Sequence, residues 1–249
     1  MKKYKLLFIL SITLSQVVTS QNLFGIAIYG VERIDKSIPE VYQSSTKTLI
    51  DLVDKGMQNL EFKLTFNNSE SSYRYIEKMT IDSDIGLKIA IAGGGGTGIK
   101  YVNSKTKEVV KQMFIDDDAY LIQSSLNDIN WTLINETKII KDYLCYKAVT
   151  VIEVELTVGE LTKMDLIAWY AIKIPVIFGP EGYGGLPGLI LELETPKMRT
   201  YIKSLKTSAK SKIDANTIEI TKPIKGKFVT PDEFRLINNK LILNYKKGF

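Results

Sequence analysis

Apolar and polar residues alternate over most of this chain, and the alternation predicts a protein built mainly of β-strands. Alternating runs occupy residues 143–156, 163–174, 189–193 and 199–206. Further runs with the same period lie at 23–31, 60–66, 73–79, 87–91, 99–101, 109–114, 120–122, 130–133, 138–140 and 217–220. Strands at such near-regular spacing favour one antiparallel meander.

Two segments carry the helical period instead. Ser37 is a suitable N-cap for a helix that runs to about Met57, because apolar residues between them recur on one face. Thr230, with Glu233 at the third helical position, predicts a short helix near the C-terminus. A long antiparallel sheet with one long helix after its first strand curls into an open or half barrel. We therefore expect an α+β fold with a strongly curved sheet, which by analogy of fold alone resembles the LolA-like lipoprotein carriers.

A loop rich in glycine and proline separates two of the predicted strands. Residues 179–188 hold five of the 17 glycines and two of the seven prolines. Glycine reaches positive φ at little cost and proline fixes φ, so a loop of this composition follows a prescribed path. We call residues 178–188 the signature loop.

The run Gly-Leu-Pro-Gly-Leu-Ile at 185–190 is the most distinctive motif, and related motifs precede it. They are Ala-Trp-Tyr at 168–170, Ile-Pro at 174–175, Gly-Pro at 179–180, Trp131, Glu-Thr-Lys at 136–138, Tyr143, Cys145 and Lys-Ala at 147–148. In order and spacing they resemble the GLPGLI family, a group of exported Bacteroidota proteins with no assigned activity. A weaker similarity lies at 62–66. The chain departs from the family pattern at 181–183, where Glu-Gly-Tyr stands for Trp-Lys-Phe, and at 171–173.

The residues in and beside the signature loop are our candidates for a binding site. They are Trp169, Tyr170, Pro175, Phe178, Gly179, Pro180, Tyr183, Gly184, Gly185, Leu186, Pro187 and Gly188. Their aromatic side chains would line a groove for an apolar ligand or for an extended partner segment. The alternative is that they only pack the loop on its sheet, which we expect for Trp169 and Tyr170.

The first twenty residues have the pattern of a cleaved signal peptide. Lysines at positions 2, 3 and 5 precede an apolar stretch at 6–18, and Val18 and Ser20 suit cleavage before Gln21. The apolar stretch is shorter than the ~20 residues that a membrane helix needs. We expect export to the periplasm or the medium, with 21–249 as a single domain. The mature net charge, 5 − 3 = +2, is too small to indicate nucleic-acid binding.

Candidates for catalysis are few. The chain has no histidine, which removes Ser-His-Asp and Cys-His pairs and the commonest transition-metal ligand. Cys145 is the single cysteine, so no internal disulfide forms, and its distance from the signal peptide excludes lipoprotein processing. Its apolar and aromatic neighbours predict a buried thiol. We expect no catalytic residue, no cofactor and no metal.

Three polar motifs have ordinary structural explanations. The glycines at 93–98 lack the Lys-Ser/Thr of a phosphate-binding loop and predict a flexible hairpin tip. The aspartates at 116–118 lack the spacing of a calcium loop and predict a solvated turn. Glu153 and Glu155 lie on one face of a predicted strand, most simply its wet face.

These features together predict a non-catalytic, exported cell-envelope protein. It would bind a lipid or other apolar ligand, or an extended partner segment, with the curved sheet as the cavity and the signature loop as its rim. The alternative is a docking or assembly module for an outer-membrane transporter or surface complex. A third hypothesis is a hydrolase that uses carboxylates alone, and it predicts two acids in one cleft with a shifted pKa.

Overall fold

The computed structural model describes residues 23–34, 45–77, 85–93, 96–208 and 219–247, and its main element is one sheet of twelve strands. The strands are β1 (Phe24–Arg33), β2 (Phe62–Phe66), β3 (Glu70–Tyr75), β4 (Lys100–Asn103), β5 (Glu108–Ile115), β6 (Asp118–Ser125), β7 (Thr132–Ile140), β8 (Tyr143–Thr157), β9 (Glu160–Ala171), β10 (Leu189–Glu194), β11 (Met198–Ser208) and β12 (Lys227–Val229). Their order across the sheet is β12-β6-β5-β4-β3-β2-β1-β11-β10-β9-β8-β7. Neighbouring strands are antiparallel except β12 and β6, which run parallel.

β1 lies in the middle of the sheet, between strands that are far from each other in the chain. It pairs with β2 on one side and with β11 on the other. The sheet therefore has two halves, β2–β6 with β12 and β7–β11, and β1 joins them. Antiparallel pairing of consecutive strands, as predicted, holds within each half, but the pairing of β1 with β11 is not a meander connection.

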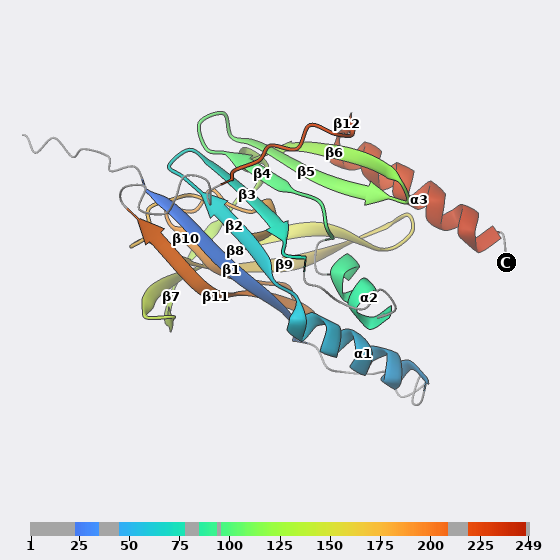
Figure 1. The fold of residues 1–249 in the computed structure, drawn as a ribbon, viewed down its shortest axis with the longest axis horizontal. Helices are drawn as coiled ribbons and strands as arrows, with labels where there is room; N and C mark the ends of the chain where they lie inside the picture. The colour runs from blue at the N-terminus through green and yellow to red at the C-terminus, as the bar shows by residue number, and fades with distance from the viewer. Residues whose placement is uncertain (1–22, 35–44, 78–84, 94–95, 209–218, 248–249) are drawn as a thin grey trace, which may run out of the picture.

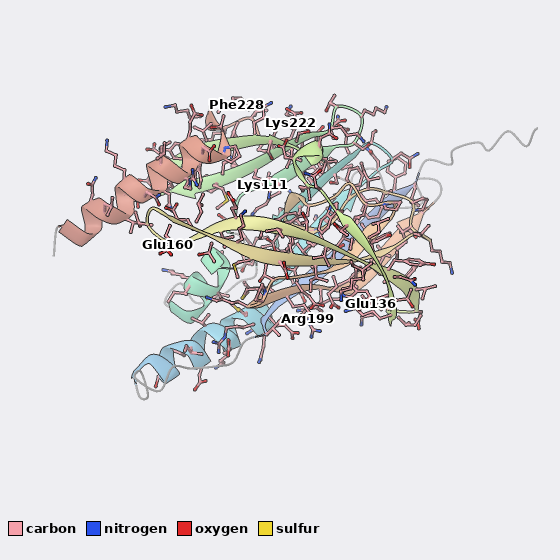
Figure 2. The ribbon with its side chains drawn as sticks, turned by 180° about the vertical axis from the view of Figure 1, so that it is seen from behind. Lys111, Glu136, Glu160, Arg199, Lys222 and Phe228 are labelled. Atoms are coloured by element: carbon pink, nitrogen blue, oxygen red, sulfur yellow. The ribbon has the colours of Figure 1, made fainter. Side chains whose placement is uncertain are left out.

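The sheet is strongly curved and unclosed, as predicted. In Figure 1, β8 and β9 pass behind the strands of the other half. Figure 2 shows Glu160, at the tip of the β8–β9 hairpin, near helix α3 (Pro231–Lys247). Here the side-chain nitrogen of Asn239 in α3 donates to Glu155 of β8 over 2.7 Å. Since α3 packs on β6 and β12, this contact links the two halves of the sheet at one end.

Alternation places one row of side chains inside the curve of the sheet. Tyr29, Phe62 and Tyr73 are fully buried there. The rings of Phe62 and Tyr73 stack with their centres 5.2 Å apart, and Tyr29 meets Tyr73 edge-on at 6.0 Å. Aromatic pairs in these geometries stabilise beyond the area that they bury, so they fix β1, β2 and β3 against one another.

Two helices, α1 (Ser45–Asn59) and α2 (Ile85–Gly93), pack against each other beside β1. A Cβ on Gly56 would lie 2.8 Å from the carbonyl oxygen of Gly86, and a Cβ on Gly86 would lie 2.5 Å from that of Leu52. Glycine on both helices therefore permits this close contact. The predicted helix after the first strand is confirmed in α1, while its predicted start at 37–44 lies outside the described residues.

α2 corrects the prediction of a strand at 87–91. The sequence there is Leu-Lys-Ile-Ala-Ile, and so short an apolar run, interrupted by Lys88, fits a helix as well as a strand. Packing against α1 through Gly86 decides in favour of the helix.

The predicted C-terminal helix is confirmed as α3, but it is not short. It has 17 residues against 15 in α1. Thr230 caps it as predicted: the backbone N–H of Glu233 donates to Thr230 Oγ1 over 3.2 Å, and the Thr230 N–H donates to the Glu233 carboxylate over 2.7 Å.

Several strand boundaries differ from the sequence prediction. Residues 132–133 and 138–140 of two predicted strands belong to one strand, β7, which has an irregularity between Ile134 and Thr137, while residues 130–131 precede it. Ile174 lies beyond β9. Residues 219–220 form no strand, although the carbonyl of Glu219 accepts from Ser72 Oγ of β3 over 3.4 Å. β12 was not predicted.

The predicted signal peptide, residues 1–20, lies outside the described residues, so its cleavage and the export of the chain stay predictions. Residues 78–79 and 217–218 of two predicted strands also lie outside. None of the helices in the described ranges is long and apolar enough to cross a membrane.

Candidate functional site

The signature loop packs across the inside of the curved sheet. Phe178 and Leu186 are 0% and 2% exposed. The short turn η3 (Pro180–Gly182) contacts β3, β4 and β5, which belong to the half of the sheet opposite β9 and β10. The loop therefore bridges the two halves and fills the interior, in place of forming the rim of an open cavity.

Glycines allow the loop to lie directly on neighbouring backbone. A Cβ on Gly184 would lie 2.3 Å from the carbonyl oxygen of Ile177, and one on Gly188 would lie 2.4 Å from that of Ala171. The Gly185 N–H donates to the same Ile177 carbonyl over 2.9 Å. The motif residues Gly184 and Gly188 thus serve close packing, which any larger side chain would prevent.

Polar side chains from four elements meet at the tip of the loop. The carboxylate of Glu181 accepts a hydrogen bond from Thr200 Oγ1 of β11 over 2.8 Å. Lys100 of β4 and Lys111 of β5 are opposite each other in paired strands, and both attract Glu181. A Cβ on Gly182 would lie 3.2 Å from Lys111 Cε, so the loop backbone rests on this lysine. We define the interior cluster as Glu181, Thr200, Lys100, Lys111 and Tyr73.

Burial changes the acid–base properties of this cluster. Lys100 is 3% exposed, and burial lowers its pKa to about 8 although Glu181 acts in the other direction. Burial also lowers the pKa of Lys111, whose Nζ lies 4.5 Å from the centre of the Tyr183 ring. The Tyr73 hydroxyl is buried with no hydrogen-bond partner in the described structure, and burial followed by the charge of Glu181 raises its pKa. A buried cation such as Lys100 is rare in a core and frequent in a functional site, whereas Lys111 is half-buried.

The backbone of Glu181 is strained. Its φ of 57° and ψ of 17° lie in the left-handed region, which costs a residue with a Cβ roughly 1 kcal/mol or more. Such a conformation persists only where surrounding contacts fix it. Here these contacts are the interior cluster and the packing of the loop.

A second charged group lies around Trp169, whose side chain is 9% exposed. Lys138 Nζ lies 4.2 Å from the centre of the Trp169 ring and 2.5 Å from Glu192 Oε1. Glu194 lies 3.4 Å from the same nitrogen. Arg199 continues the group, 4.0 Å from Glu192 and paired with Glu32. We define the ion row as Lys138, Glu192, Glu194, Arg199 and Glu32.

The two glutamates of β10 have pKa values that move apart. Burial, with Glu194 adjacent, raises the pKa of Glu192 against the attraction of Lys138. Burial acts the same way on Glu194, but hydrogen bonding to Glu192 and the charge of Lys138 lower its pKa overall. The hydrolase hypothesis predicts two neighbouring acids of which at least one has a shifted pKa, and Glu192 and Glu194 meet that condition. Lys138 contacts both carboxylates, however, so they are arranged as partners of a cation.

A polar hollow of about 470 Å³ lies at the end of the ion row, where α1 meets the sheet. Its lining consists of Glu32, Arg33, Ile34, Asp54, Met57, Gln58, Glu194 and Arg199. Arg33 donates twice to Asp54, both over 2.9 Å. Most of the lining is charged, so the hollow differs from the apolar groove that was expected beside Trp169.

The signature loop also braces the hairpin of β7 and β8. Trp131, directly before β7, donates its indole N–H to the Gly184 carbonyl over 2.9 Å. Leu186 packs in a buried cluster with Ala148 of β8 and Tyr170 of β9. These contacts agree with the packing role expected for Tyr170 and place Trp131 against the loop.

β8 is longer than its partner β7 and leaves part of its outer edge open. β7 pairs with residues 143–149 of β8, and beyond them β8 pairs only with β9 among the described strands. A hollow of about 520 Å³ lies at this transition, lined by Asp128, Asn130, Thr132, Ile134, Val149, Thr150 and Val151. Val151 is 57% exposed. We call residues 150–155 the open edge of β8.

Cys145 is a buried free thiol, as predicted. Burial raises its pKa to about 11, and its Sγ donates to the carbonyl of Tyr143 over 3.4 Å. The protonated thiol is a poor nucleophile, so the site favours a packing role.

The aspartate motif lies where its structural explanation places it, but the glycine run follows helix α2 and precedes β4, so it is not the predicted hairpin tip. Asp116 and Asp117 form the exposed turn between β5 and β6, with Asp116 at a φ of 50°. The glycine run begins at the end of α2, and its residues 94–95 lie outside the described structure. Glu153 is exposed on β8. In the described ranges no group of three or more His, Cys, Asp or Glu side chains is placed to hold a metal ion.

The structure divides the twelve candidate residues of the sequence. Trp169 and Tyr170 follow each other on β9 and belong to different clusters, because successive side chains of a strand point to opposite faces. Phe178, Gly179, Pro180, Gly184, Leu186 and Gly188 are buried, Tyr183 is half-buried, and Pro175, Gly185 and Pro187 are exposed. Sequence reasoning missed Lys100, Lys111, Tyr73 and Thr200. One signal in the sequence could have found Lys100. It lies two residues before the apolar Val102, so on a strand both side chains point to the same face, which Val102 marks as the buried one.

Comparison with known proteins gives a family match over part of the chain and a likeness of fold. The model of a family described as "Protein of unknown function (Porph_ging)" matches residues 156–192. Two solved structures of PNGF-II, in space groups C2 and P21, superpose with TM-scores of 0.50 and 0.51 at 13% and 15% identity. Each match covers 88% of this chain, which spans only 33% and 34% of those chains. No curated protein matches.

Proposed function

We propose that this chain is an exported, non-catalytic protein of the cell envelope, of the GLPGLI family, that docks an extended segment of a partner protein. The observation that carries the proposal is the open edge of β8 beside the hollow at Val151. A strand that lacks a neighbour presents unpaired backbone groups, and an extended peptide satisfies them by adding a strand.

The side chains of the open edge define the chemistry of the partner segment. Val151 and Glu153 are exposed on one face, and Ile152 and Val154 are half-buried on the other. Directly opposed charges of unlike sign and apolar pairs stabilise neighbouring strands. We therefore propose a segment that alternates apolar residues with at least one lysine or arginine, the basic residue lying across from Glu153.

β7 itself is protected against such pairing. The irregularity between Ile134 and Thr137 interrupts the strand, and Glu136 forms an exposed ion pair of 2.9 Å with Lys147. Interruptions and charges at an edge are common devices against unspecific strand pairing. A partner segment would therefore pair with the open edge of β8 and not with β7.

We also propose that the fold is a half barrel of the LolA-like type, and the curved, unclosed sheet supports this. An outer-membrane transporter or a surface complex is the partner class that export would bring within reach. In this arrangement the signature loop is a scaffold, because it holds the β7–β8 hairpin through Trp131.

A photo-reactive amino acid placed at position 151 in intact cells tests the docking edge. Ile224, which is 85% exposed and lies far from β8 in sequence, provides the matched control position. We expect one discrete cross-linked partner from position 151 and none from 224, and we expect Glu153→Lys to weaken it. Leu161→Lys, on the neighbouring strand and 43% exposed, should leave it unchanged. Equal cross-linking at both positions, or none at 151, would contradict the proposal.

Export is tested separately by fractionating the source cells and measuring the mass of the purified protein. We expect a periplasmic or extracellular chain that begins at Gln21. A cytoplasmic chain that retains residues 1–20 would overturn the envelope assignment.

A further inference from the structure

The interior cluster has no part in the docking edge, and the buried charge of Lys100 within it calls for a separate explanation. We propose that the interior of the sheet beneath the signature loop is a binding site for an amphiphile with a carboxylate head, and that Glu181 occupies the place of that carboxylate while the site is closed. This inference does not depend on the partner docking proposed above.

Glu181 makes the contacts that a ligand carboxylate would make. It accepts from Thr200 over 2.8 Å and lies within the field of Lys100 and Lys111. It reaches this place only with a left-handed backbone, at a φ of 57°. A free carboxylate would accept the same hydrogen bond and meet the same cations without that strain.

Tyr73 provides a donor that the closed state leaves unused. Its hydroxyl is buried, has no partner in the described structure, and lies close enough for Glu181 to influence its ionisation. A carboxylate has about four lone-pair positions on its two oxygens. A ligand head placed between Tyr73, Thr200 and Lys111 would therefore satisfy a group that is otherwise costly to bury.

The surroundings of the cluster require that the anion be carried on an apolar chain. Phe62 stacks on Tyr73, and Val102 and Val109 are 1% and 2% exposed on the adjoining strands. A small inorganic anion would lose its water here without burying any apolar surface. Phe178 and Leu186 would leave with the loop, so an alkyl chain would replace apolar side chains by similar atoms.

The chain contains its own reporter for movement of the loop. Of its two tryptophans, Trp131 donates to Gly184 within the loop, and Trp169 can be removed as Trp169→Phe. In that background we would titrate sodium dodecanoate, below its micelle concentration and at pH 7, and follow the emission of Trp131. Dodecanol is the matched uncharged control, and calorimetry gives the affinity independently.

We expect a saturable change with dodecanoate and none with dodecanol. Glu181→Gln should bind dodecanoate about tenfold more tightly, because the competing charge is gone while the side-chain shape remains. Lys111→Met should bind at least about tenfold more weakly, and Lys111→Arg should restore binding. Thr200→Val is the alternative variant if Lys111→Met does not fold, and it too should weaken binding.

Three results would overturn the proposal. They are an equal response to the alcohol and the acid, no binding of dodecanoate even to Glu181→Gln, and unchanged affinity in the folded Lys111 or Thr200 variants. Circular dichroism of each variant establishes folding before the titrations.

Discussion

At the scale of single residues, the most informative position is Lys100. A lysine that is 3% exposed opposes folding whenever it is charged, because its ammonium group loses water. The pKa of Lys100 is about 8 in the folded protein against its usual 10.5, so the unfolded chain holds the proton more tightly. The penalty is therefore complete below pH 8 and disappears as the pH rises towards 10.5.

Replacing Lys100 by methionine tests this penalty. We expect Lys100→Met to raise the free energy of unfolding by roughly 1–3 kcal/mol at pH 7. Urea unfolding at pH 7 and pH 9 provides the measurement, and the advantage of the variant should shrink by about 1 kcal/mol at the higher pH. An advantage that does not change with pH would show that packing, and not charge, causes the effect.

Gly188 tests the close packing of the loop. A Cβ at this position would lie 2.4 Å from the backbone carbonyl of Ala171, which cannot move without disturbing β9. We expect Gly188→Ala to destabilise the protein by about 2 kcal/mol or more in thermal or urea unfolding. Pro187→Ala, at the exposed neighbouring position, is the control and should cost little. Equal effects of the two changes would contradict the packing argument.

Cys145 provides a test of burial that needs no substitution. Because burial raises the pKa of its thiol to about 11, little thiolate exists at pH 8. We expect a disulfide reagent to label the native chain at least a hundredfold more slowly than the chain in denaturant. Rapid labelling of native protein would place the thiol at the surface.

At the scale of elements, α3 is held differently from the strands. None of its described side chains is fully buried, and its contacts with the rest include the edge-on pair of Phe234 with Tyr120 at 5.7 Å. Thr230→Ala removes the capping hydrogen bond and should cost the helix about 1 kcal/mol. Amide exchange in α3 should accelerate while the thermal midpoint of the sheet changes little. A large fall of that midpoint would mean that α3 is integral to the core.

Elements were predictable where their own pattern decided the structure. The alternation at 143–156 predicted β8, where residues 148–153 are alternately more and less buried. The run at 189–193 was correctly predicted as a strand, β10, although its residues 189–193 are all buried. The run at 87–91 is too short for its pattern to separate a helix from a strand, and the contact of Gly86 with α1 favours the helix. Capping of α3 by Thr230 was likewise visible in the local sequence.

The site was predictable only in part, for the same reason. Glycine and proline identified the loop, since their backbone preferences are local. The position of the loop inside the sheet depends on its contacts with strands up to about a hundred residues away in the chain. The local sequence of the loop does not predict these contacts. Lys100 and Lys111 resemble solvent-facing lysines of strands until Glu181 is brought to them.

At the scale of the whole molecule, the two halves of the sheet are joined by β1 and bridged by the signature loop. We expect them to unfold together. Both tryptophans belong to the β7–β11 half or its immediate approach, so their emission reports that half, while circular dichroism reports all strands. The two urea transitions should coincide. An earlier tryptophan transition would show that the halves are independent units.

Because β1 lies in the middle of the sheet, one of its two partner strands is synthesised long after it. Residues 24–33 leave the ribosome early, yet their partner strand at 198–208 is made about 165 residues later. At typical rates of translation that interval lasts roughly 10–30 s. During that interval β11 does not yet exist, so the backbone groups of β1 that pair with it in the folded protein have no partner strand. A chain built in this order would benefit from a chaperone that covers its first strand until its last long strand arrives.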